Sequence, residues 1–132
     1  MNRADQILVA FSNFHRANPE IYNAFKEYTL HVISTGRKGY SAKAIIERIR
    51  WNLEVERRGE DVKINNNFTA YYARLFHAEF PAQDGFFKLR HRISQEAPAS
   101  NNDQQFFDSG DPGEELALKG YLYNLLKETR HV

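Results

Sequence analysis

The sequence predicts a mainly α-helical fold, a compact helical domain of helix-turn-helix or winged-helix type with an additional C-terminal helix. Three observations support this prediction. The 132 residues are 42% hydrophobic and 27% charged, which is typical of one globular domain. Apolar residues recur at steps of three and four along most of the chain. Ser, Asn, Pro and Gly stand where the helices should begin or end.

Two helices are expected in the first 36 residues. The first, over about residues 3–14, follows from apolar residues at helical spacing, which are Ile7, Leu8, Phe11 and Phe14. The second begins at Asn18-Pro19-Glu20, which supplies an N-cap, a proline in the first helical position and an acid in the first turn. We expect this helix to end at Gly36.

A long third helix is expected from Ser41, its N-cap, to about residue 58, where Gly59 ends it. Its apolar stripe consists of Ile45, Ile46, Ile49 and Leu53. Charges of opposite sign recur on another side, which predicts a solvated face made of Lys43, Glu47, Arg50, Glu54, Arg57 and Arg58. Trp51 and Val55 lie on yet another side, where Trp51 provides either a contact surface or a lid over a neighbouring helix, and we expect it to pack in the core or against a helix.

The middle of the chain predicts a pair of helices joined by a short turn. A short β-prone stretch, residues 62–64, precedes an Asn cluster that caps a helix over residues 67–80. Residues 84–94 then form a second element, in which Phe86 to Ser94 fits both a helical and a strand period, and we favour the helix. Two helices of these lengths have the dimensions of a helix-turn-helix unit.

The C-terminal part is expected to differ from the helical core domain, residues 1–94. Residues 95–113 are polar and acidic without a basic side chain, which predicts a flexible loop, and residues 114–132 form a leucine-rich helix. The apolar residues of this part predict a surface for a partner or for a second copy of the chain. They are Phe106, Phe107, Leu118, Leu122 and Leu125.

The charge is unevenly distributed along the chain. Residues 1–36 carry three basic and three acidic side chains, residues 37–92 carry twelve and seven, and residues 93–132 carry three and seven. The net charges are therefore 0, +5 and −4, which sum to the formal +1. A basic middle beside an acidic tail indicates either a phosphate-binding surface or a tail that folds back onto the basic part.

The predicted DNA contacts lie on the two middle helices. Whether residues 86–94 form a helix or a strand, one face of this element is basic, and the element contains no acidic residue that could pair with it. The predicted contacts on this element are Lys88, Arg90, His91 and Arg92. The N-terminus of the preceding helix favours a phosphate, and Asn can read an adenine edge. Small residues on one side of this preceding helix would let its backbone approach either a DNA groove or another helix. The supporting contacts are Asn66, Asn67, Thr69 and Arg74.

Enzyme and cofactor chemistry has little support. There is no Cys, and the five His residues show no pair at four-residue spacing, so we expect neither a metal site nor any other cofactor. Asp61-Val62-Lys63 fits half of a metal-dependent nuclease signature, but no suitable carboxylate precedes it. Without Cys, an apolar span or a signal peptide at the N-terminus, we expect a cytoplasmic protein that does not contact membranes.

One further set of segments stands out in the sequence. It consists of Lys63-Ile64-Asn65-Asn66-Asn67-Phe68-Thr69-Ala70-Tyr71-Tyr72-Ala73-Arg74, then Pro81 and Gly85-Phe86-Phe87, with Asn18-Pro19 and Ile21-Tyr22 upstream. These segments resemble a group of small phage- and prophage-encoded α-helical proteins of unassigned function. The match covers about residues 14–94. Members are sometimes labelled DNA-binding by fold analogy, so the resemblance implies either a DNA-binding regulator or a small inhibitor of a host or defence protein.

Two hypotheses of function follow. The first is a non-enzymatic DNA-binding protein from a phage or mobile element, with a regulatory role. The alternative is a small interaction protein, dimeric through its C-terminal helix, that inhibits a host or anti-phage defence protein. The first predicts binding that weakens steeply with salt, whereas the second predicts binding that tolerates salt because apolar area dominates.

Overall fold

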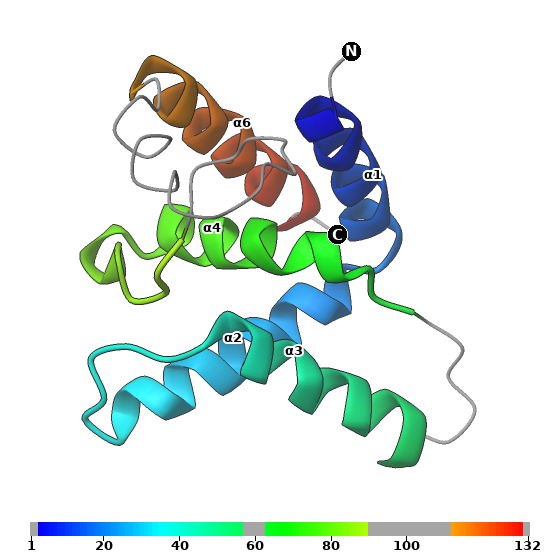
Figure 1. Ribbon diagram of the computed structural model, residues 1–132, viewed down its shortest axis with the longest axis vertical. Helices are drawn as coiled ribbons and strands as arrows, with labels where there is room; N and C mark the ends of the chain where they lie inside the picture. Colours follow the sequence, from blue (N-terminus) through cyan, green and yellow to red (C-terminus); the bar gives the residue numbers. More distant parts are fainter. Residues whose placement is uncertain (1–2, 57–62, 90–111, 131–132) are drawn as a thin grey trace, which may run out of the picture.

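The computed structural model describes residues 3–56, 63–89 and 112–130 (Figure 1). This part of the chain is mainly helical and contains no strand. The elements in order are α1 (Arg3–Ala17), α2 (Pro19–Ser34), α3 (Ala42–Trp51), the π-helix η1 (Asn52–Glu56), the 3-10 helix η2 (Asn66–Phe68), α4 (Thr69–Glu79), the 3-10 helix η3 (Pro81–Gln83) and α6 (Pro112–Arg130). The prediction of an all-α class is confirmed.

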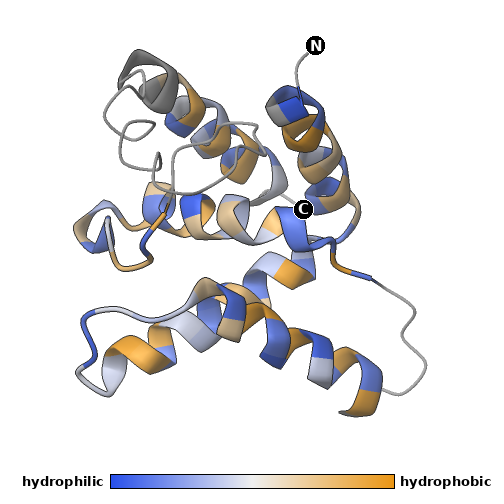
Figure 2. Ribbon diagram, viewed as in Figure 1, coloured by the Kyte–Doolittle hydropathy of each residue, from blue (hydrophilic) through white to orange (hydrophobic). Residues whose placement is uncertain are grey.

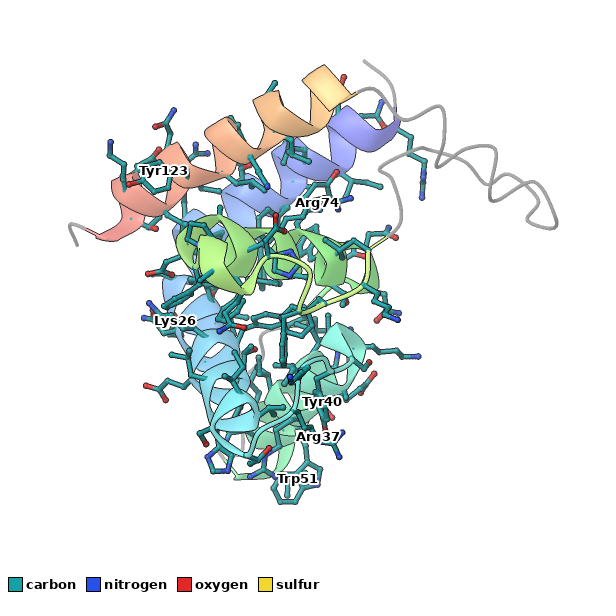
Figure 3. All side chains as sticks on the ribbon, turned by 90° about the vertical axis from the view of Figure 1, so that its left-hand side faces the viewer. Lys26, Arg37, Tyr40, Trp51, Arg74 and Tyr123 are labelled. Carbon is teal, nitrogen blue, oxygen red and sulfur yellow. The ribbon has the colours of Figure 1, made fainter. Side chains whose placement is uncertain are left out.

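The helices are arranged in three levels around α4. In Figure 1, α4 runs across the middle of the molecule, with α1 and α6 on one side and α2 and α3 on the other. The turned view in Figure 3 shows the same order. Every residue from Tyr71 to His77 is buried, which agrees with this central place. α4 is therefore the element on which both helix pairs are packed.

Aromatic rings fill the space on both sides of α4. The Tyr72 ring lies at the centre, with ring centroids 4.9 Å from Phe11 of α1 and 5.8 Å from Phe25 of α2. Phe87 then contacts Phe25 at 5.4 Å and Phe76 at 5.9 Å. Each such ring pair contributes about 0.5–1.5 kcal/mol beyond the area that it buries. The core thus links residues from α1 to the turn after α4 through one ring cluster.

The predicted capping residues explain where the helices begin. Ser41 Oγ accepts a hydrogen bond from the backbone N–H of Ala44 at 3.1 Å, and Asn65 Oδ1 accepts one from Asn67 at 2.8 Å. Asn18 behaves differently, because its amide donates to the Phe14 carbonyl instead of capping α2. α2 nevertheless begins at Pro19, whose fixed φ suits the first helical position. Three of the predicted helix starts are therefore correct.

The predicted helix over residues 86–94 is wrong in its described part, because residues 86–89 form bends and extended chain. Gly85 has a φ of +93°, and the chain turns there. Phe86 and Phe87 are then both buried. Phe87 N–H donates to Nε2 of His77 at 3.1 Å and holds the turn against α4.

The third helix also differs from its prediction. It is α-helical only to Trp51 and continues as the π-helix η1 to Glu56, while residues 57–58 lie outside the described part. Hydrophobic and hydrophilic residues alternate along α3 in Figure 2, as expected of an amphipathic helix. Of the β-prone stretch, residues 63 and 64 are not in a strand, and residue 62 is not described.

Candidate nucleic-acid interface

The described residues among the predicted DNA contacts lie at different places in the structure. Asn66 and Asn67 are exposed and Thr69 is half-buried at the start of α4, whereas Lys88 is exposed beyond its end. Along the chain, the 11 residues of α4, which span about 16 Å, and the turn at Gly85 lie between Thr69 and Lys88. The other three residues predicted on that element, Arg90, His91 and Arg92, lie outside the described residues.

Arg74 lies in the interior, not on the surface that DNA binding requires. It is 7% exposed, and its guanidinium carbon lies 5.6 Å from the Tyr71 ring centroid. The small side of α4 to which Arg74 belongs includes Ala73, which is fully buried. α6 makes its most extensive contact with α4. Ala73 and Arg74 are therefore not open to a DNA groove, because both are buried.

The leucines of the C-terminal helix are buried within the chain. Leu118, Leu122 and Leu125 are at most 4% exposed and belong to the same core as the aromatic rings. They therefore do not form the open partner surface that the sequence predicted. Phe106 and Phe107, the other two residues of that surface, lie outside the described residues.

Arg50 and Asn66 connect α3 to the segment before α4. One guanidinium nitrogen of Arg50 donates to the Ile64 carbonyl at 2.7 Å and to Asn66 Oδ1 at 2.6 Å. Another donates to Glu47 at 2.9 Å. Reading an adenine edge needs both the oxygen and the nitrogen of an Asn amide, and in Asn66 the oxygen is already engaged. Asn66 and Arg50 thus have a structural use.

A different surface combines cations with exposed rings. We call it the arginine–aromatic surface, and it consists of Arg37, Lys38, Tyr40, Lys43, Arg48 and Trp51 on α3 and the turn before it. Trp51 is 46% exposed and Tyr40 is 38% exposed. Figure 3 shows Arg37, Tyr40 and Trp51 gathered at the end of the molecule farthest from α1 and α6. Trp51 is therefore not in the core, one of the two packing arrangements expected of it.

Each exposed ring of this surface has a guanidinium group beside it. The Arg37 guanidinium carbon lies 5.5 Å from the Tyr40 ring centroid. That of Arg48 lies 5.4 Å from the Trp51 centroid and 5.6 Å from the centroid of Tyr28 on α2. These distances are within the range of cation–π attraction. The Arg48 side chain is thus held by two rings from two helices.

Local structure explains why Arg48 and Trp51 lie together in solvent. They are three residues apart on α3, so they share one face of the helix. The opposite face carries Ile45, Ile46 and Ile49, which are all buried. The spacing in the sequence already indicates this shared face. Ala44, Arg48, Trp51 and Val55 are separated by four, three and four residues, and none of them belongs to the isoleucine stripe.

The arginine–aromatic surface carries uncompensated positive charge. Residues 35–51 contain five basic side chains and one acidic one, a net charge of +4. The single acid, Glu47, pairs with Arg50. Within residues 3–56, 63–89 and 112–130, no carboxylate lies within 4.0 Å of the other four, Arg37, Lys38, Lys43 and Arg48. The surface therefore attracts anions.

A small hollow of about 50 Å³ lies between α1, α2, α4 and α6. It is lined by His15, Pro19, Tyr22, Asn23, Lys26, Glu79, Leu126 and Thr129. The Tyr22 hydroxyl donates to one Glu79 oxygen at 2.7 Å, and the Lys26 ammonium donates to the other at 3.2 Å. This volume accommodates a few water molecules or a solute of similar size. The hollow is too small for a nucleotide.

His15 is the titratable group of this hollow with the most perturbed environment. Burial, with a smaller effect of the neighbouring Arg16, lowers the pKa of His15 to about 4, so the ring is neutral at pH 7. Nε2 lies 3.1 Å from Thr129 Oγ1, whose own proton is directed to the carbonyls of Leu125 and Leu126. Nε2 is therefore the donor. Nδ1 has no partner among the described residues.

Other kinds of site receive no support from the described part of the chain. No group of three His, Cys, Asp or Glu side chains in it is placed to hold a metal ion. None of its helices combines the length and apolarity that crossing a membrane requires. No protein-family model, curated protein or solved structure matches this chain.

Proposed function

We propose that this protein binds nucleic acid, without catalysis, through the arginine–aromatic surface. The observation that carries the proposal is that each of two exposed rings, Tyr40 and Trp51, has a guanidinium group beside it, and that the four cations of this surface have no carboxylate partner among the described residues. Cations neutralise phosphates and release their counterions, while rings stack on bases. The contact surface proposed here replaces the one that the sequence alone predicted on residues 86–94.

The neighbouring structure supports this use of the surface. Arg48 is already oriented by the Tyr28 and Trp51 rings, so its side chain loses little conformational entropy when a ligand binds. The π-helix η1 follows Trp51 directly, and such segments are frequent at functional sites. Because α6 packs on the other side of α4, the arginine–aromatic surface is open at the far end of the molecule (Figure 3).

The test is a fluorescence-anisotropy titration of a labelled oligonucleotide at roughly 50 and 200 mM salt. We expect binding at the lower salt concentration and a clear loss at the higher one. The variant with Arg37→Ala and Lys38→Ala together should bind more weakly, and its affinity should depend less on salt. No binding by the intact protein at the lower salt concentration would overturn the proposal.

The chain offers a matched control at its other end. Lys127 lies 5.4 Å from the Tyr123 ring centroid, and Tyr123 is as exposed as Trp51. This pair is also a cation beside an exposed ring, but on α6. Lys127→Ala removes one positive charge and should leave the affinity almost unchanged. An equal loss for Lys127→Ala and Arg48→Ala would show that only the net charge matters, which contradicts a specific surface.

The alternative function, a small interaction protein, now has a different basis. Its predicted leucines are buried, but Trp, Tyr and Arg are the residues that most often dominate protein interfaces. The uncompensated charge favours the nucleic acid, because a polyanion satisfies every cation of the surface at once. Failure of the titration with every oligonucleotide would leave protein binding as the explanation of the exposed rings.

A further inference from the structure

We infer that the nucleic acid is single-stranded and that one of its bases stacks on Trp51. This inference rests on the proposed function and deepens it by naming the form of the ligand. The decisive feature is the exposed ring itself, because phosphate contacts alone would need only the four cations. Almost half of the Trp51 side chain is open to solvent, although indole is one of the largest apolar groups.

The chemistry of stacking separates the two forms of nucleic acid. In a duplex the base faces are covered by their neighbours, so a protein ring reaches them only by unstacking a step. In a single strand every base offers an open π-face, and aromatic side chains next to cations are the usual binding surface for such strands. Trp51 beside Arg48, and Tyr40 beside Arg37, provide this combination twice.

The described helices lack a surface suited to reading duplex DNA. Duplex readers insert a helix into the major groove with polar side chains toward the base edges. The helix expected for this use is absent over residues 86–89, and Ala73, Arg74 and His77 on the small face of α4 are buried. The exposed face of α3 carries Trp51, whose bulk opposes entry into a groove.

The chain supplies its own reporter for the test. Trp51 is the single Trp of the sequence, so all tryptophan emission comes from the proposed stacking site. A twelve-nucleotide deoxythymidine strand and a twelve-base-pair duplex are titrated into the intact protein at roughly 50 mM salt. We expect the single strand to quench the emission and to bind at least about tenfold more tightly than the duplex.

Variants separate stacking from folding. Trp51→Ala should weaken single-strand binding by about tenfold or more, whereas Trp51→Phe, which keeps a ring, should recover part of the affinity. Both variants should give the helical circular dichroism of the intact protein, because Trp51 is not in the core. Tyr123→Ala, the matched exposed ring on α6, should leave single-strand affinity unchanged. Binding of each variant is measured by anisotropy.

Each outcome bears on a different statement. Equal or tighter binding of the duplex, without quenching, would overturn the single-strand inference and leave the proposed function standing. No binding of either probe would overturn both. Single-strand binding that survives Trp51→Ala unchanged would show phosphate contacts alone and would overturn the stacking inference.

Discussion

The guanidinium group of Arg48 lies beside the Trp51 ring, with 5.4 Å between the guanidinium carbon and the ring centroid. Tyr28, from α2, lies at 5.6 Å from the same carbon. One arginine thus connects an exposed indole to a half-buried ring of the neighbouring helix. Because the two rings belong to different helices, the orientation of the exposed indole depends on the packing of α2 against α3.

Replacing Arg48 should affect binding more than folding. Arg48→Ala removes two cation–π contacts, with Trp51 and with Tyr28, which contribute about 0.5–1 kcal/mol each, so urea unfolding should show a loss of no more than about 2 kcal/mol. The same change removes a phosphate contact and the neighbour that orients Trp51, so the affinity for single strands should fall severalfold. Anisotropy and urea titrations measure the two effects. A large loss of stability with unchanged affinity would make Arg48 a structural residue.

Tyr72→Phe should stabilise the protein. Tyr72 is fully buried, its hydroxyl has no hydrogen-bond partner among the described residues, and burial raises its pKa. Removing an unpaired buried hydroxyl should therefore increase the free energy of unfolding by about 1 kcal/mol. Tyr22→Phe is the control, because it removes the bond to Glu79 and should destabilise by a similar amount. Equal destabilisation by both changes would mean that the Tyr72 hydroxyl is paired.

Stability should fall on acidification because of His15. Its pKa is about 4 in the folded protein, against 6.5 for an unperturbed histidine, so the unfolded state binds the proton more readily. This contribution is fully present above pH 6.5 and is lost as the pH falls toward 4. Between pH 7.5 and 5 the loss amounts to about 2 kcal/mol. Burial also lowers the pKa of His77, which acts in the same direction.

The non-titrating variant His15→Leu isolates this effect. Its free energy of unfolding at pH 7.5 will differ from that of the intact protein, but only the slope with pH decides the question. We expect the variant to lose about 2 kcal/mol less over the same interval. Urea unfolding at pH 7.5, 6.5, 5.5 and 5 measures the slope, and identical slopes would mean that His15 titrates normally in the folded state.

Leu122→Ala tests whether the C-terminal helix belongs to the core. Leu122 is fully buried, so its truncation should cost about 2–5 kcal/mol. Tyr123→Ala, the neighbouring exposed position, should cost less than about 1 kcal/mol. Thermal unfolding measures both. If Leu122 instead served a dimer, its truncation would change the molecular mass in sedimentation and leave the stability of the monomer almost unaltered.

Local signals located most of the helices correctly. Ser41, Asn65 and Pro19 begin helices for reasons that involve only neighbouring backbone groups, so a sequence contains what is needed to find them. The turn at Gly85 was also visible, but the conformation after it was not. Phe86 and Phe87 are both buried because tertiary contacts with His77 and Phe76 outweigh the local period.

Helical periodicity states which residues share a face, and this much was determined by the sequence alone. It does not state what covers that face. On α4 the small side, with Ala73 and Arg74, is buried in the interior, whereas on α3 Trp51 stays 46% exposed although Arg48 beside it contacts Tyr28 of α2. Both outcomes depend on long-range packing of α6 and α2, because only the assembled core determines which apolar faces find a partner.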